Sequence, residues 1–260
     1  MTDDIAAPHR IERASRAGGP SAIAGFLFQI LRSVQLGVRI GVAFTAGSPD
    51  QTGMLLTLEP LGGGDHRISD NEGTVIEQVK MRAGHRRWSA AEIAREVFPD
   101  LLKAAQPHST QTFRFVTNNA KGLGSFAEFL QAFQSNDPTS PPSSVRWGRD
   151  RLSVPEYAAR LAEAADIAVE DESYRWLLAN LTLEIIETAA VEAEIDSLLE
   201  PALAPGQRSE GKRHELIGRL LEAASKSRRL DAADLLSMVH PDAYLRLAHA
   251  RTLPDILARR

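Results

Sequence analysis

The chain has 260 residues, of which 43% are hydrophobic and 25% charged, with a formal net charge of -4 and no cysteine. This length and apolar content suffice for one large core or two small ones, and the lack of cysteine excludes disulfides and thiolate metal sites. We find no apolar run of transmembrane length and no signal-peptide pattern, which predicts a soluble, cytoplasmic protein with no membrane partner.

The predicted elements of the first half alternate between helix and strand. A polar, flexible N-terminus at 1–18 precedes one long, largely apolar helix at 20–44. Periodicity then predicts strands at 54–60, 66–69 and 74–82, a helix at 89–105, a strand at 112–119 and a short helix at 125–133. Ser89 and Glu92 have the spacing of a capping box. This order predicts an α/β core.

The segment 134–150 is rich in Pro and Ser and is the best candidate for a domain boundary. We therefore expect a core at 19–150 and a mainly helical accessory region at 151–260. Helical patterns there cover 154–165, 171–179, 188–200, 210–225 and 231–239, whereas LTLEIIE (181–187) fits either a strand or part of a helix.

Polar residues interrupt the apolar strand predicted at 74–82. Strand alternation places Gln78 and Lys80 on one face and Glu77 on the other. Asp65 opens the preceding strand, after three glycines. A Gln/Lys pair is commonly a solvated strand edge, and Asp65 could simply shape the turn. The alternative is that the three side chains form one site.

The pattern Asp65, twelve intervening residues, then Gln78-x-Lys80 resembles the PD-(D/E)xK nuclease superfamily, and in particular the Mrr-like endonuclease domains at the N-termini of bacterial anti-phage proteins. Gln29 in GFLFQ and Glu59 before the glycines complete the resemblance, which covers about residues 20–120. It implies a restriction-endonuclease-like core, in which a helix, a three-strand meander, a helix and a strand follow one another.

The resemblance also implies a reaction. Asp65 and Gln78 would hold Mg²⁺, with Mn²⁺ as a substitute, Lys80 would act on the attacking water, and Glu59 and Gln29 would assist. The implied function is a metal-dependent endonuclease for double-stranded DNA, an effector of anti-phage defence that homo-oligomerises on activation. Such domains are commonly fused to a sensor or NTPase module, so a fragment of a longer protein is one alternative for this chain.

A basic loop, KMRAGHRRW, follows the strand and carries Arg82, His85, Arg86 and Arg87, which we expect to contact DNA phosphates. A solvated charged face is the alternative. The rival to the enzyme is a non-catalytic DNA-binding or oligomerisation scaffold that retains the nuclease fold. Gln78 occupies a position where a carboxylate is common, which favours the scaffold. Convergence of Asp65, Gln78 and Lys80 in one concave site would favour the enzyme.

Overall fold

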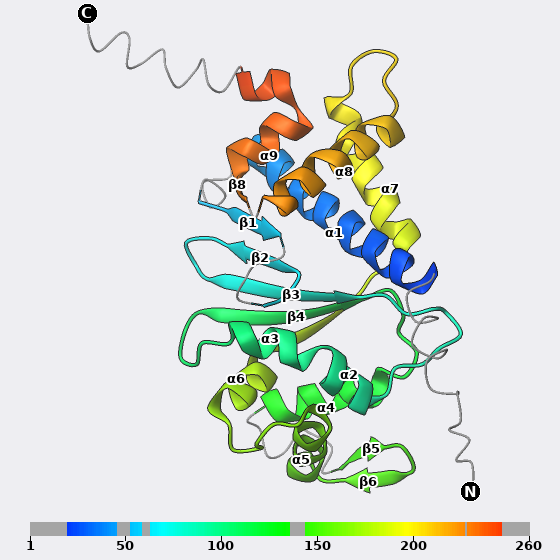
Figure 1. Cartoon of the computed structure of the whole chain (residues 1–260), viewed down its shortest axis with the longest axis vertical. Coiled ribbons are helices and arrows are strands. Elements are labelled where there is room, and N and C mark those ends of the chain that lie inside the picture. Colours follow the sequence, from blue (N-terminus) through cyan, green and yellow to red (C-terminus); the bar gives the residue numbers. More distant parts are fainter. Residues whose placement is uncertain (1–19, 46–52, 59–62, 136–143, 227, 246–260) are drawn as a thin grey trace, which may run out of the picture.

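A six-stranded sheet lies between two layers of helices (Figure 1). The computed structural model describes residues 20–45, 53–58, 63–135, 144–226 and 228–245. The elements of the first half are α1 (Pro20–Thr45), β1 (Leu55–Leu58), β2 (His66–Ser69), β3 (Thr74–Lys80), α2 (Ala90–Glu96), α3 (Phe98–Ala104), β4 (Gln111–Thr117) and α4 (Gly124–Gln134). Those that follow are β5 (Val145–Trp147), β6 (Asp150–Leu152), α5 (Val154–Ala165), α6 (Glu172–Asn180), β7 (Leu181–Ile185), α7 (Thr188–Leu199), a 3₁₀ turn (Glu200–Ala202), α8 (Ser209–Ser225), β8 (Arg229–Asp231) and α9 (Ala232–Val239).

The strand order in the sheet is β7-β4-β3-β2-β1-β8. Strands β1 to β3 form an antiparallel meander, β4 pairs with β3 in parallel and β7 pairs with β4 in parallel. The α/β class and the order helix, three strands, helix, strand are those expected from the sequence. Strands β7 and β8, however, come from the expected accessory region, so the sheet extends across the expected boundary at residue 150. LTLEIIE contains the strand β7.

Each face of the sheet has its own hydrophobic core. Helices α1, α7, α8 and α9 cover one face, and α2 to α6 cover the other (Figure 1). The first core contains Val34 of α1 and Val79 of β3, and the second contains Ile76 of β3 and Phe115 of β4. Strand β3 is therefore buried on both sides, as parallel-paired central strands usually are.

Helix α1 is the main element of the first layer. By length and composition Ala22–Phe44 could cross a membrane, which corrects our expectation that no apolar run reaches that length. In the structure, 61% of this stretch is buried, and Phe28, Val34 and Val38 are at most 1% exposed. A core helix has such a composition too. The cytoplasmic location stays a prediction.

The helix predicted at 89–105 is two helices. The first, α2, begins with the expected capping box, in which Ser89 Oγ accepts from the Glu92 amide and the Glu92 carboxylate accepts from the Ser89 amide. It ends at Glu96, and α3 begins at Phe98 with a proline in its first turn. Pro99 has no N–H to donate to the preceding turn, so the chain restarts there as a new helix.

Two glycines hold the start of β2 close to its neighbours. Gly64 has φ +79°, and a Cβ atom there would lie 2.6 Å from Ile76 Cγ2. Gly63 has φ +97° and faces the backbone carbonyl of Asp100. Residues with a side chain rarely adopt such angles, so the glycines allow the chain to approach β3 immediately before Asp65.

Candidate functional site

Asp65 lies directly before β2 and bonds to the neighbouring strand. Its amide donates to the Glu77 carbonyl at 2.7 Å. Its Oδ2 accepts from the Val79 amide at 2.6 Å and from Gln78 Nε2 at 2.8 Å. The cross-strand pair of His66 with Glu77 places Asp65 opposite Gln78, and opposite residues of an antiparallel pair share a face. The structure thus brings Asp65 and Gln78 together, as the sequence predicts.

Asp65 carries a carboxylate in a poorly solvated place. Burial raises the pKa of the Asp65 carboxyl above its ordinary value, and the hydrogen bond from the Val79 amide and the positive charge of Lys80 offset this only in part. The charged form is therefore destabilised in the absence of a closer cation. Any positive ion that reaches the carboxylate removes part of that cost.

Gln78 is buried, at 1% exposure, and its two amide atoms differ in environment. Nε2 donates to Asp65, whereas Oε1 is buried and has no hydrogen-bond partner among the residues that the structure describes. A buried acceptor without a donor is uncommon and asks for an explanation. Carboxylate and amide oxygens are the ligands that Mg²⁺ takes in proteins, so the donor set of Asp65 and Gln78 fits a hard divalent cation.

Of the other residues expected in the site, Gln29 lies at it, Lys80 lies near it and Glu59 is outside the described part of the chain. Gln29 on α1 reaches the site and donates to the Val79 carbonyl at 3.3 Å. Lys80 is half-buried and has no carboxylate within 4 Å among the residues that the structure describes, although its charge acts on Asp65. Glu59 lies outside the described residues. Among the described residues, no three His, Asp or Glu side chains gather as a metal site, so a cation here would depend on the amide and on water.

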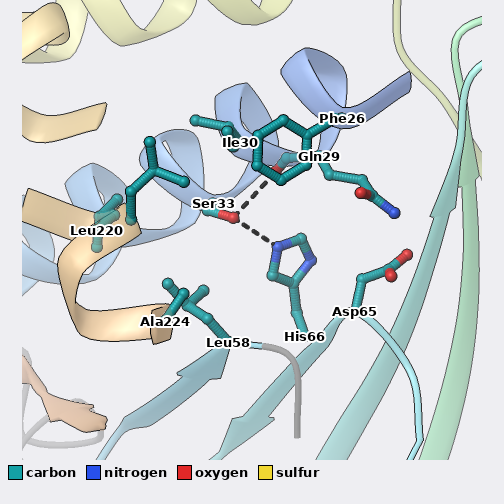
Figure 2. A pocket seen from close by; sticks show the side chains of 10 residues that line it. Phe26, Gln29, Ile30, Ser33, Leu58, Asp65, His66, Leu220 and Ala224 are labelled. Carbon is teal, nitrogen blue, oxygen red and sulfur yellow. Dashed lines mark hydrogen bonds between the residues drawn. The ribbon is translucent and has the colours of Figure 1, made fainter. Parts of the chain in front are cut away.

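A pocket opens beside Asp65, between α1, the sheet and α8 (Figure 2). The enclosed part of the pocket holds about 30 Å³, room for a water molecule or a small ion, and the volume reaches about 400 Å³ only when the open space at its mouth is counted. Polar groups from Gln29, Ser33, Asp65 and His66 line one part of it. The apolar wall is formed by Phe26, Ile30, Leu58, Leu220, Leu221 and Ala224. Apolar walls with a few convergent polar groups are typical of small-molecule sites.

His66 connects this pocket to the interior. Its Nε2 lies 2.8 Å from Ser33 Oγ, as Figure 2 shows, and Ser33 Oγ also donates to the Gln29 carbonyl at 2.9 Å. Its Nδ1 lies 3.3 Å from Glu77 Oε1. Ser33 and His66 were not predicted as site residues. The signal for His66 is its place next to Asp65 at the strand start.

Glu77 points away from Asp65, as strand alternation predicts, and enters a buried ion-pair network. It is fully buried and accepts from Arg32 Nη2 at 2.6 Å and Arg32 Nε at 3.1 Å, and from Arg114 Nη1 at 3.0 Å. Burial alone would raise the pKa of the Glu77 carboxyl, but the nearby His66 ring and the hydrogen bonds and charge of Arg32 hold it well below its ordinary value. Glu77 is therefore ionised at neutral pH.

The network extends from Arg32 to the protein surface. Arg32 also donates to Glu184 Oε2 of β7 at 2.7 Å and to Gln35 Oε1 at 2.7 Å. Gln35 Nε2 donates to Glu194 of α7 at 2.7 Å. Sequence reasoning missed this network, although an arginine within the apolar helix α1 and a glutamate within the apolar strand β3 were two opposite charges in elements expected to be buried.

The basic loop after β3 is only partly free for a ligand. Arg82 is 7% exposed, lies 3.7 Å from the centre of the Trp88 ring and pairs with Glu92 at 2.8 Å and with Glu96 at 3.0 Å. It therefore holds the loop to α2, which differs from its expected contact with phosphate. His85, Arg86 and Arg87 are exposed and make no ion pair with another described residue.

No protein-family model and no curated protein matches the sequence. Solved structures that match include the Acinetobacter baumannii Cap4 SAVED/CARF-domain containing receptor with the cyclic trinucleotide 3′3′3′-cAAA, at a TM-score of 0.45 and 13% identity, covering 83% of this chain and 44% of the receptor. The Moraxella osloensis Cap4 SAVED/CARF-domain containing receptor matches at a TM-score of 0.45 and 11% identity, covering 84% of this chain and 47% of the receptor. The chain thus spans less than half the length of these receptors.

These findings correct two expectations. The matching structures are described as receptors and not as nucleases, so the assignment to the PD-(D/E)xK, Mrr-like nucleases is overturned. The function based on it, an endonuclease for double-stranded DNA, is overturned with it. The restriction-endonuclease-like identity of the core is not confirmed, and the α/β class stands. At this TM-score and identity the likeness is distant, and no residue role is carried over from the receptors.

Proposed function

We propose that the chain is a ligand-binding module that takes a nucleotide at the open mouth of the pocket beside Asp65, held in part through a divalent cation. The observation that carries the proposal is Gln78 Oε1, a buried acceptor that no other described residue bonds, next to the carboxylate of Asp65. An unpaired buried acceptor costs about 1–3 kcal/mol. A cation shared with Asp65 would satisfy the Gln78 oxygen and lower the cost of the buried carboxylate.

Asp65 and Gln78 would hold the cation, Mg²⁺ or Mn²⁺. When bound, the cation offers positive charge to a ligand phosphate. The Gln78 amide now turns its nitrogen towards Asp65, so cation binding requires its two ends to exchange by rotation about the terminal side-chain bond. Asp65 keeps its bond from the Val79 amide in either state, because that donor is backbone and stays in place.

Two further features favour a nucleotide over a bare anion. Lys80 has no ion-pair partner among the described residues and lies near enough to influence Asp65, so it is available to a phosphate. The pocket wall includes Phe26 and Leu221, which are 47% and 37% exposed. Exposed apolar and aromatic side chains beside a polar site can pack against a base.

The cation is tested by calorimetric titration of Mg²⁺ and Mn²⁺ into wild type, Asp65→Asn and Gln78→Glu. We expect Asp65→Asn to weaken binding at least tenfold, because two neutral amides then face a doubly charged ion, and Gln78→Glu to strengthen it. Glu72→Gln is the matched control, since Glu72 is an exposed carboxylate on the same hairpin. Equal affinity in all four proteins would refute the cation site.

The ligand is tested by the same method with ATP and with 3′3′3′-cAAA, each with Mg²⁺ and with EDTA. We expect binding that depends on Mg²⁺ and weakens in Lys80→Ala, while the Mg²⁺ affinity of that variant does not fall, because the substitution removes a positive charge that acts on Asp65. Phe26→Ser should weaken nucleotide binding and leave inorganic phosphate binding unchanged. Binding of Mg²⁺ without binding of either nucleotide would keep the cation site and refute the ligand.

Several sequence expectations stay predictions at this site. Magnesium-dependent hydrolase activity is one of them, and incubation of the purified protein with plasmid DNA, with Mg²⁺ and with EDTA, tests it. Homo-oligomerisation, a fused or associated sensor or NTPase module, a role in antiviral defence and DNA contacts by His85, Arg86 and Arg87 are the others. Light scattering with and without the nucleotide would show whether the ligand changes the oligomeric state.

A further inference from the structure

The hairpin of β5 and β6 lies apart from the pocket, at the far side of the second helical layer in Figure 1. Its two strands pair with Val145 opposite Leu152, Arg146 opposite Arg151 and Trp147 opposite Asp150. Gly148, with φ +62°, and Arg149 form the turn. Opposite residues of an antiparallel pair share a face, so Arg146 and Arg151 stand side by side.

The other face of the hairpin is fixed to the core. Val145 is 1% exposed, and Trp147 packs its ring edge against Tyr157 of α5, with ring centres 5.0 Å apart. Ser153 caps α5 immediately after β6 through a complete capping box. The two arginines are therefore presented by a short hairpin that is anchored on one face and at its exit.

Nothing in the described protein neutralises these arginines. Arg146, Arg149 and Arg151 are exposed, and none of their side chains makes an ion pair or hydrogen bond with another described residue. Asp150 is the single acidic residue of the hairpin and belongs to the opposite face. Like charges directly opposite each other destabilise a strand pair. The arrangement is unfavourable for the fold alone and favourable for an external polyanion.

We propose that the β5–β6 hairpin binds the phosphodiester backbone of a nucleic-acid strand. Guanidinium groups match phosphate in a bidentate geometry, which an ammonium cannot do. Directly opposite residues have Cβ atoms only about 5 Å apart, so two neighbouring phosphates of one strand can be engaged together. Contacts to phosphate carry no sequence information, so we expect this binding to be independent of sequence.

The proposal is tested by fluorescence anisotropy of a short labelled oligothymidylate over a range of salt concentrations. Loss of two phosphate contacts should reduce the slope of log affinity against log salt by about 1.4, which corresponds to roughly 25-fold weaker binding at about 0.1 M salt. We expect this change in the double variant Arg146→Gln/Arg151→Gln. Arg146→Lys/Arg151→Lys should recover part of the affinity, because it keeps the charge and loses the bidentate geometry.

The matched control is Arg219→Gln/Arg228→Gln, which removes the same charge from exposed arginines that pair with Glu215 and Asp234. It should keep the wild-type slope. Two results would overturn the proposal. One is an unchanged slope in the β5–β6 variant with an intact circular dichroism spectrum. The other is equal competition by polyglutamate at the same charge concentration, which would assign the hairpin to acidic protein partners.

Discussion

Replacing Arg32 by methionine is expected to destabilise the protein strongly. The substitution removes the guanidinium that donates to both carboxylate oxygens of Glu77, and both side chains are fully buried. Leaving one buried charge without its partner costs about 3–5 kcal/mol of unfolding free energy. Arg114 and His66 still face Glu77 in the variant, so we expect the lower end, about 3 kcal/mol.

Urea unfolding measures this change, with the fluorescence of the three tryptophans as the signal. For a chain of this size, about 3 kcal/mol corresponds to a fall of roughly 6–12 °C in melting temperature. The double variant Arg32→Met/Glu77→Leu should recover more than half of the lost free energy. Replacing both charges by apolar groups removes the desolvation cost together with the attraction.

The pH dependence gives a second readout. In the wild type the pKa of Glu77 is held below its ordinary value of 4.5, so its contribution to stability is present above that pH and is lost as pH falls below it. The difference in free energy of unfolding between wild type and Arg32→Met should therefore be largest at neutral pH and decrease in acid. A difference under about 1 kcal/mol at neutral pH, or a double variant no more stable than Arg32→Met, would refute the reasoning.

Three further predictions concern single sites. Ser89→Ala should lower the free energy of unfolding by about 1 kcal/mol in urea, through loss of the α2 cap, and an unchanged midpoint would contradict this. Gly64→Ala should lower the melting temperature, because φ is +79° and the new Cβ meets Ile76, whereas Gly84→Ala, which has open space, should not. Burial raises the pKa of Asp65, so without divalent cations wild type should lose stability relative to Asp65→Asn as pH rises above 3.8; parallel pH profiles would exclude this.

The features of the fold that were predicted correctly depend on residues that are close together in the sequence. The long apolar helix, the hairpin around residues 70–73, the capping box at Ser89 and the alternation that separates Glu77 from Gln78 all depend on neighbouring residues, and all appear in the structure. The approach of Asp65 to Gln78 was predicted for the same reason, since one hairpin joins them.

Interactions between distant segments were not predictable in this way. Glu184 and Arg32 are 152 positions apart and meet only because β7 joins the sheet beside β4. Arg82 was expected at the surface because its neighbours are basic, but Trp88 and the acidic residues of α2 draw it inwards. The assignment to a family was wrong because it depended on a motif of three residues, Asp65, Gln78 and Lys80. So short a motif does not determine the function of the whole chain.

The strand order has a consequence for synthesis on the ribosome. Strand β1 has β8 as its outer neighbour, paired through Leu56 and Leu230, although 174 positions separate the two. Strand β4 likewise has one unpaired edge until β7 (Leu181–Ile185) is synthesised. Until β7 and β8 leave the ribosome, both edge strands of the nascent sheet present unpaired N–H and C=O groups. Strands of another chain can pair with these groups. A nascent chain that stalls before residue 229 keeps one such margin open.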